Sequence, residues 1–345
     1  MTGPLVAGIL VLALLFAGHS IFIALAFSLF IIANIWPLQR GLQRWMPKLL
    51  ALLIALLVTM GITIVIGSSV VWGFGKLGHW LLANADRFQT TYLTWTAWLE
   101  QHGIAILGPL TDRFDVSWLV GVTQTIAVKL NSLAGSAVLV FIFVMLGLLE
   151  VDDFNARLLS PAVQPFGQRI VMAHRLIGIK LRRFMLVRTF ASILTGFVVW
   201  LFALSAGLEL ASAWGAIAFA LNYIPFLGPM VATALPTLFA IGQFESWQTA
   251  LLIFASLSII QFIIGSYLEP RLTGATLAIS PFAVIFAVFF WSFMWGLPGA
   301  FIGVPILIAF TVYCACFDGT RWVAALLAHG HECIDVDQKP AGERE

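Results

Sequence analysis

The sequence predicts an all-α integral membrane protein with about eight transmembrane helices. Hydrophobic residues make up 61% of the 345-residue chain and charged residues only 10%, whereas a soluble domain carries roughly 25% charged residues. The apolar residues also gather in runs close to the length of about 20 residues that a bilayer-spanning helix needs. We therefore treat residues 1–345 as one polytopic transmembrane domain.

The first apolar residues of the chain predict two short spans or one long bent span. They cover Pro4–Gly18 and Ser20–Trp36, with GHS between them. The start of the chain lacks the basic residues of a secretory signal and runs directly into the second apolar segment. We therefore expect it to be retained as a span.

Four of the following apolar segments have the length of a single span. They are Leu49–Val71, Ser132–Leu149, Met185–Leu204 and Trp247–Ser266. Two other segments are about twice as long and are interrupted by Pro and Gly, and these are Ala211–Ile241 and Pro281–Cys314. Because proline breaks a helix, we expect both long segments to form broken helical hairpins.

The distribution of charge predicts the orientation in the membrane. Residues 37–48 carry three basic residues and no acid, and residues 150–188 carry seven basic residues. Residues 72–131 balance four basic residues against four acidic ones. Basic loops stay in the cytoplasm, so we expect 37–48, 150–188 and both termini to be cytoplasmic and 72–131 to be external.

The two longest polar regions are expected to be helical as well. Aromatic and aliphatic residues recur at helical spacing within 72–131, which predicts external amphipathic helices on the bilayer or against neighbouring subunits. The basic segment 150–188 predicts a cytoplasmic helical loop that is attracted to anionic lipid.

The stretch ALNYIPFLGPMVAT, residues 220–233, is the first interruption of an apolar segment. Pro225 and Pro229 each remove a backbone donor, so we expect the carbonyls of Leu221 and Pro225 to be freed. Broken backbone at membrane depth is tolerated where it is buried in protein or lines a wet cavity. The stretch therefore predicts part of a translocation path, with ordinary kinks between packed helices as the alternative.

Two further interruptions follow, SYLEPRLTGATLAISP and WGLPGAFIGVP. In the second, Gly296, Gly299 and Gly303 recur at spacings of three and four, ahead of Pro305. Small residues on one helix face let helix backbones approach closely, so these positions predict helix packing.

Glu269 is the strongest candidate for a functional ionisable group, because such residues inside a membrane are rare and usually functional. It would take up a proton or a cation beside Arg271. The alternative is a structural ion pair at a helix end. The residues predicted to line the path for the solute or ion are Asn222, Tyr223, Pro225, Gly228, Pro229, Gln261, Glu269, Pro270, Arg271, Thr273, Gly274 and Ser280.

The segments WGAIAFALNYIPFLGP, YLEPRLTGATLAISP, WGLPGAFIGVP and LLEVDDF resemble the autoinducer-2 exporter family of bacterial membrane transporters. The resemblance covers almost the whole chain and is weakest at 72–131. It implies a helical transporter fold with about eight spans, a homo-oligomer and a substrate that is either the quorum-sensing signal autoinducer-2 or, in other members, sodium and protons.

We therefore expect a transporter of the bacterial inner membrane that exports a small polar solute and is coupled to protons. A sodium/proton antiporter on the same scaffold and a passive pore built by the oligomer are the alternatives. The sequence contains no enzyme motif or nucleotide-binding domain, so we expect neither cofactor nor metal. A net charge of +2 gives no reason to expect nucleic acid as a partner, and membrane lipid is the expected surroundings.

Overall fold

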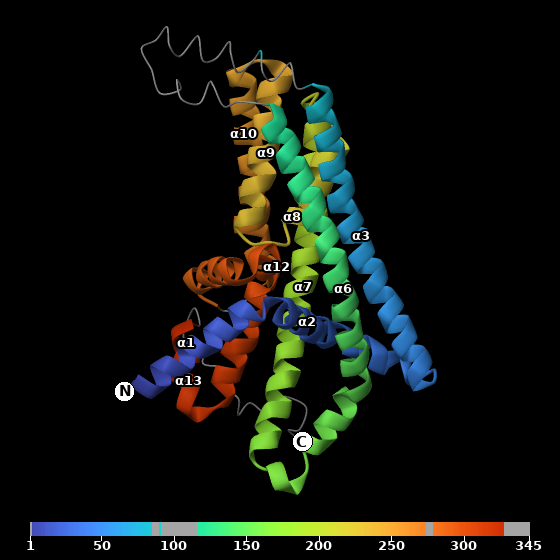
Figure 1. Cartoon of the computed structure of the whole chain (residues 1–345), viewed down its shortest axis with the longest axis vertical. Coiled ribbons are helices and arrows are strands. Elements are labelled where there is room, and N and C mark those ends of the chain that lie inside the picture. Colours follow the sequence, from blue (N-terminus) through green and yellow to red (C-terminus); the bar gives the residue numbers. More distant parts are fainter. Residues whose placement is uncertain (1, 85–89, 91–115, 274–278, 328–345) are drawn as a thin grey trace. The chain divides into compact units, whose positions relative to one another are not determined.

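The computed structural model describes residues 2–84, 90, 116–273 and 279–327 (Figure 1). Every regular element within these ranges is a helix, which confirms the all-α prediction. The chain divides into two compact units. Unit 1 comprises Met1–Gly61, Ser136–Val187 and Arg271–Glu345, and unit 2 comprises Ile62–Gly135 and Arg188–Pro270.

The described residues include six helices that are long and apolar enough to cross a membrane. These are His19–Leu42, Lys48–Ala83, Phe166–Ser205, Leu227–Phe244, Trp247–Leu272 and Pro281–Cys316. Two shorter apolar helices cover Val6–Ala17 and Ala211–Leu221. The chain is therefore a multi-pass membrane protein, and the total of about eight spans stays a prediction.

In unit 1, α1 (Thr2–Ala17) and α2 (His19–Leu42) are separate helices on either side of Gly18. A Cβ at Gly18 would lie 3.0 Å from the Phe22 ring and 3.1 Å from the Leu14 carbonyl, so glycine suits this turn. α2 extends beyond the predicted span and contains Pro37, which has no N–H to donate to the Ala33 carbonyl. The Nη1 atom of Arg182 on α7 (Phe166–Ser205) donates to that carbonyl at 3.1 Å instead.

The helices α3 (Lys48–Ala83) and α6 (Val116–Leu158) are both longer than the spans predicted within them. The apolar run predicts only the length that lies in lipid. Neither helix contains a proline, and α3 continues through Gly73 and Gly75 beyond the predicted end at Val71. In unit 1, Leu52 of α3 packs against Val144 and Leu148 of α6, with Trp36 of α2 beside them. Of the predicted amphipathic region, 85–89 and 91–115 lie outside the described residues, while 72–83 and 116–131 continue α3 and α6.

The double-length segment of unit 1 is a hairpin within α12 (Pro281–Cys316). Gly296 has φ 66° and ψ −145°, a conformation that favours glycine. A Cβ at Gly299 would lie 1.8 Å from the Trp291 carbonyl oxygen, and one at Gly303 would lie 2.9 Å from the Ala287 carbonyl oxygen. The second half of α12 therefore packs directly on the first. The prediction that Gly296 shares a helix face with the other two glycines is wrong, because the helix turns back at Gly296.

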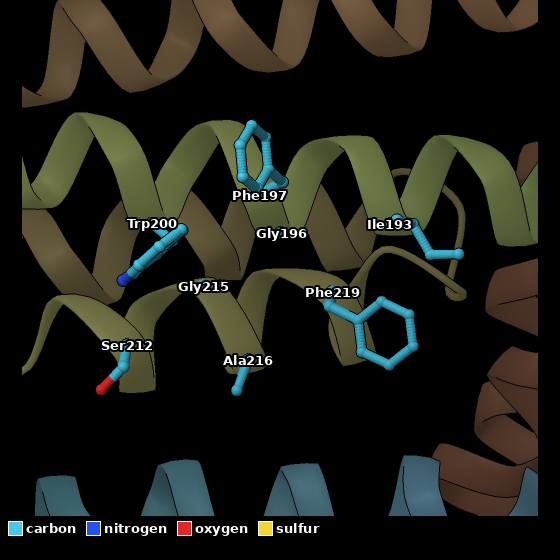
Figure 2. A pocket seen from close by; sticks show the side chains of 8 residues that line it. All are labelled: Ile193, Gly196, Phe197, Trp200, Ser212, Gly215, Ala216 and Phe219. Carbon is cyan, nitrogen blue, oxygen red and sulfur yellow. The ribbon is translucent and has the colours of Figure 1, made fainter.

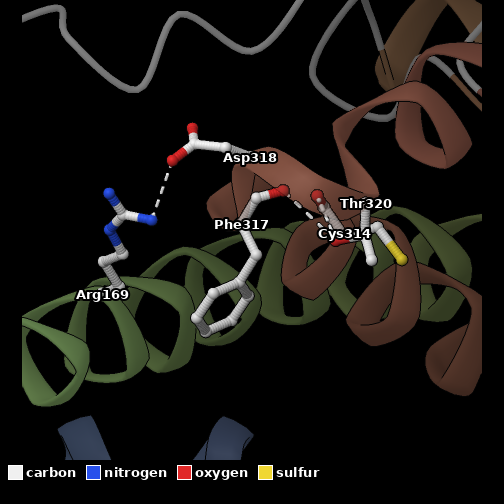
Figure 3. Close-up of polar contacts among 5 residues, drawn as sticks. All are labelled: Arg169, Cys314, Phe317, Asp318 and Thr320. Atoms are coloured by element: carbon white, nitrogen blue, oxygen red, sulfur yellow. Dashed lines mark hydrogen bonds and ion pairs between the residues drawn. The ribbon is translucent and has the colours of Figure 1, made fainter.

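Polar contacts hold the end of α12 to the start of α7 (Phe166–Ser205) in unit 1 (Figure 3). The short helix η1 (Pro161–Val163) precedes α7, and η4 (Asp318–Thr320) and α13 (Arg321–Leu327) follow α12. The Arg169 guanidinium pairs with the Asp318 carboxylate at 3.0 Å. The Thr320 hydroxyl donates to the Cys314 carbonyl at 3.1 Å, so it satisfies a carbonyl at the end of α12.

Unit 2 contains α8 (Ala211–Leu221), α9 (Leu227–Phe244) and α10 (Trp247–Phe262), with the second half of α7 and the end of α3. α9 packs against both α8 and α10 (Figure 1). Aromatic rings form part of the core of unit 2: the Phe239 ring lies 4.2 Å from the Trp80 ring and 5.1 Å from the Trp214 ring, centroid to centroid. Gln243 holds the α7–α8 loop by accepting from the Glu209 N–H at 2.9 Å and donating to the Gly207 carbonyl at 2.8 Å.

The second predicted interruption begins with a change of helix type rather than a break. A π-helical turn, Ile263–Leu268, follows α10 and leads directly into α11 (Glu269–Thr273). The apolar helix therefore runs to Leu272 and not to Ser266 as predicted. A π turn holds more residues than an α turn and is frequent at functional sites.

Candidate functional site

The site in unit 2 begins with a close crossing of α7 and α8. Gly196 on α7 faces Gly215 on α8 (Figure 2), and a Cβ on either one would lie 2.8 Å from the carbonyl oxygen of the other. Glycine at both positions lets the two backbones approach. The crossing brings residues of α7 close to the end of α8, where the chain is interrupted.

An apolar groove of about 300 Å³ lies along this crossing. It is lined by Ile193, Gly196, Phe197, Trp200, Ser212, Gly215, Ala216 and Phe219 (Figure 2). Phe197 and Ile193 are more than half exposed, as is normal for side chains that face lipid. The groove therefore suits acyl chains rather than a polar solute.

Polar side chains connect α7 to the residues just after α8. The Asn222 amide nitrogen donates to the Ser192 hydroxyl at 3.2 Å, and the Tyr223 hydroxyl donates to the Thr189 hydroxyl at 3.3 Å. Asn222 and Tyr223 are each 4% exposed, and Ser192 is fully buried. Buried polar groups of this kind are stable only when they are hydrogen-bonded.

An ion pair lies beside these polar groups. Nη1 of Arg188 on α7 lies 2.5 Å from Oε1 of Glu269 on α11. The Arg188 side chain is 5% exposed and that of Glu269 is 20% exposed, so both charges are largely withdrawn from water. The guanidinium also lies within Coulombic range of the Tyr223 phenol.

Several buried polar atoms near α7 have no hydrogen-bond partner within the described ranges. They are Nε and Nη2 of Arg188, the hydroxyl of Thr195 and the amide nitrogen of Gln261. Arg188, Ser192 and Thr195 recur at helical spacing and are all buried, so they share one face of α7. Unsatisfied groups of this kind are available to a ligand.

The interruption between α8 and α9 covers residues 222–226, as predicted. The prediction that it frees two carbonyls is wrong. The Leu221 carbonyl accepts from the Ile224 N–H at 2.9 Å, and the Pro225 carbonyl accepts from the Leu227 N–H at 2.7 Å. Turn hydrogen bonds replace the helical ones that the prolines remove.

Glycine is also required at the end of this turn. A Cβ at Gly228 would lie 1.9 Å from the Leu221 carbonyl oxygen. Gly228 and Pro229 form the first turn of α9, where a proline is tolerated because its missing N–H has no helical partner.

The other predicted pathway residues do not all gather at this site. Pro270 and Arg271 follow Glu269 on α11 and are exposed. Thr273 ends α11, and Gly274 lies outside the described residues. Ser280 belongs to unit 1, where its N–H donates to the Leu327 carbonyl at 2.8 Å. The packing residues Gly296, Gly299, Gly303 and Pro305 also belong to unit 1.

The sequence interpretation missed Arg188 as a site residue because it was counted with the basic cytoplasmic segment. The signal was present, since Arg188 lies inside the span predicted at Met185–Leu204. It also begins a polar stripe that continues through Ser192 and Thr195. A charged residue within a span, followed by hydroxyls on the same face, predicts an inward-facing position.

The chain is similar in sequence to known transport proteins. A sequence profile of the AI-2E family of transporters matches residues 5–316. The chain is 27% identical over 231 residues to the AI-2 transport protein TqsA of Escherichia coli K12, with 67% of this chain and 66% of the relative covered. It is 25% identical over 221 residues to the E. coli K12 protein named "Putative transport protein YhhT", with 64% and 62% covered.

The chain spans about two thirds of the length of these two relatives. The profile match, by contrast, extends over nearly all of the chain and includes the interruptions at 222–226 and Gly296. The chain therefore belongs to the AI-2E family of transporters.

Proposed function

We propose that this protein exports a small polar solute across the bacterial inner membrane, with autoinducer-2 as the first candidate, and that the export is coupled to protons. The buried Arg188–Glu269 pair, next to Asn222 and Tyr223, carries the proposal. Charged residues within membrane-crossing helices are costly, and they usually mark substrate or ion pathways. The name of the relative TqsA supports the choice of solute.

The chemistry of the site suits a small polyhydroxylated molecule. Asn222 offers an amide, while Tyr223, Thr189 and Ser192 offer hydroxyls. These groups both donate and accept hydrogen bonds. They exchange partners with a solute hydroxyl at little cost, because each bond that breaks is replaced by a similar one.

Glu269 is the proposed proton carrier. Its side chain is 20% exposed, whereas that of Arg188 is 5% exposed. Glu269 is therefore the more accessible of the two charged groups. Protonation of Glu269 removes the negative charge from the pair, so it changes how strongly α7 and α11 attract each other.

The proposed orientation follows from the basic residues. Residues 37–48, both termini and the basic segment 150–188, up to the start of the span predicted at Met185, lie in the cytoplasm, and residues 72–131 are external. Arg188 then lies toward the cytoplasmic end of the apolar half of α7, where an exporter takes up its solute. The proposal includes assembly as a homo-oligomer.

Sodium/proton exchange is the second candidate. A sodium site needs several oxygen ligands, which freed carbonyls of Leu221 and Pro225 would supply together with Glu269. Both carbonyls accept turn hydrogen bonds, and Arg188 places a positive charge beside the carboxylate. These two observations favour the polar solute over the cation.

The test uses the purified full-length protein in sealed vesicles. Autoinducer-2 accumulation is measured with and without an imposed pH gradient for wild type, Glu269→Gln and Glu150→Gln. Glu150 is exposed, so it is the matched control. We expect saturable, gradient-dependent accumulation that is lost only in Glu269→Gln. Flux without saturation would indicate a passive pore, and sodium-dependent proton movement without accumulation would indicate ion exchange.

A further inference from the structure

We propose that Arg188 binds the solute directly through Nε and Nη2, and that the solute presents two neighbouring acceptor oxygens, as a carboxylate or a vicinal diol does. The inference rests on the proposed function in one respect only, which is that the residues around Arg188 and Glu269 form the solute site. It specifies the chemical class of the ligand, which neither the family nor the relatives' names determine for this chain.

The planar guanidinium has its donors in a fixed arrangement. Nη1 is engaged by Oε1 of Glu269. Nε and Nη2 form a different edge of the same plane, and both are buried without a partner within the described ranges. Two parallel N–H groups on one edge match two oxygens held side by side.

Because Nε and Nη2 of Arg188 are buried, leaving them without hydrogen-bond partners costs free energy. The Arg188 side chain is only 5% exposed, so water does not freely replace a missing partner. A buried donor without a partner destabilises the fold, and a charged donor does so more strongly. The neighbouring polar groups do not fill the edge: the Asn222 amide donates to Ser192 and the Tyr223 hydroxyl to Thr189, and neither Nε nor Nη2 of Arg188 has a hydrogen-bond partner within the described ranges.

The charge of the edge determines which ligands it accepts. N–H donors on a positive group attract oxygen lone pairs and repel cations. Glu269 already balances the charge of Arg188, so a neutral vicinal diol leaves the site neutral. A carboxylate shares the two-oxygen geometry but adds a negative charge. A vicinal diol and a carboxylate therefore differ in charge, while both present two oxygens side by side, and binding of one probe or the other distinguishes them.

The experiment is a calorimetric titration of the purified full-length protein in detergent. The probes are acetate, cis-tetrahydrofuran-3,4-diol and, as a probe with one hydroxyl, tetrahydrofuran-3-ol. The variants are Arg188→Lys, which keeps the charge but not the two-donor edge, and Arg183→Lys as the matched control. Arg183 is exposed and donates to the Leu272 carbonyl at 3.4 Å.

We expect acetate or the diol to bind the wild type saturably and at least about 10-fold more tightly than the single-hydroxyl probe. Loss of one charge-assisted hydrogen bond weakens binding by about 10- to 100-fold. That loss is expected in Arg188→Lys and not in Arg183→Lys. Binding of acetate alone identifies an anionic ligand, and binding of the diol alone identifies a neutral one.

The inference would be overturned if neither acetate nor the diol bound the wild type more tightly than the single-hydroxyl probe. This comparison uses only wild-type protein, so it holds even if Arg188→Lys does not fold. Wild-type affinity in a folded Arg188→Lys would overturn it as well. If the probes bind in an Arg188-dependent way but the wild type does not transport autoinducer-2, only the proposed function is refuted. If the wild type transports autoinducer-2 but Arg188→Lys binds the probes as the wild type does, only the inference about Arg188 is refuted.

Discussion

Replacing Glu269 with Gln removes one charge of the buried pair and leaves Arg188 without its counter-ion. Breaking a buried pair in this way destabilises a protein by about 3–5 kcal/mol. The amide oxygen of the glutamine still accepts a hydrogen bond from Arg188, so it partly compensates for the lost charge. We therefore expect a loss of about 3 kcal/mol in the free energy of unfolding, near the lower end of that range.

The assay is equilibrium unfolding in mixed detergent micelles, carried out as a double-mutant cycle with Arg188→Met. The double variant has no buried charge at the pair, and well-packed apolar replacements of buried pairs are often neutral or stabilising. We therefore expect it to be more stable than Glu269→Gln alone. A loss below about 1 kcal/mol in Glu269→Gln, as for an exposed pair, would refute the burial that the reasoning depends on.

Two other predictions concern helix packing. Gly215→Ala places a methyl group 2.8 Å from the α7 backbone, so we expect a loss of about 1–3 kcal/mol in the free energy of unfolding. Gly61→Ala, with nothing within 4 Å, should lose none, and equal effects of the two would contradict the close crossing. Arg182→Leu removes the donor to the Ala33 carbonyl, which Pro37 leaves without a helical partner. Thermal unfolding should therefore show a loss of about 1 kcal/mol in the free energy of unfolding. Adding Pro37→Ala should restore it, because the alanine N–H replaces the lost donor, and failure to restore it would refute this role of Arg182.

The interruptions of the helices were predictable from sequence because Pro and Gly act on their own backbone. The break at 222–226 and the turn at Gly296 are both local events, and they follow from a missing donor and a positive φ. The new hydrogen-bond partners of the Leu221 and Pro225 carbonyls were not predictable in the same way. Whether the Leu221 carbonyl finds a turn donor depends on the full conformation of the next three residues.

The ion pair itself could be predicted only in part. Glu269 was a candidate from its position in an apolar segment, but its partner Arg188 is 81 residues away along the chain. The pairing depends on how α7 and α11 pack, and the π turn at Ile263–Leu268 changes which way Glu269 faces. Neither tertiary packing nor a π turn leaves a periodic pattern in the sequence.

The most direct test of the central claim compares wild type with the double variant Arg188→Met/Glu269→Gln in sealed vesicles under an imposed pH gradient. Autoinducer-2 accumulation is measured in both, after equilibrium unfolding has shown that the double variant is folded. If the pair serves transport, the wild type accumulates the solute saturably and the folded double variant does not exceed empty vesicles. Equal accumulation in both proteins would contradict the claim, because the pair would then serve only the fold.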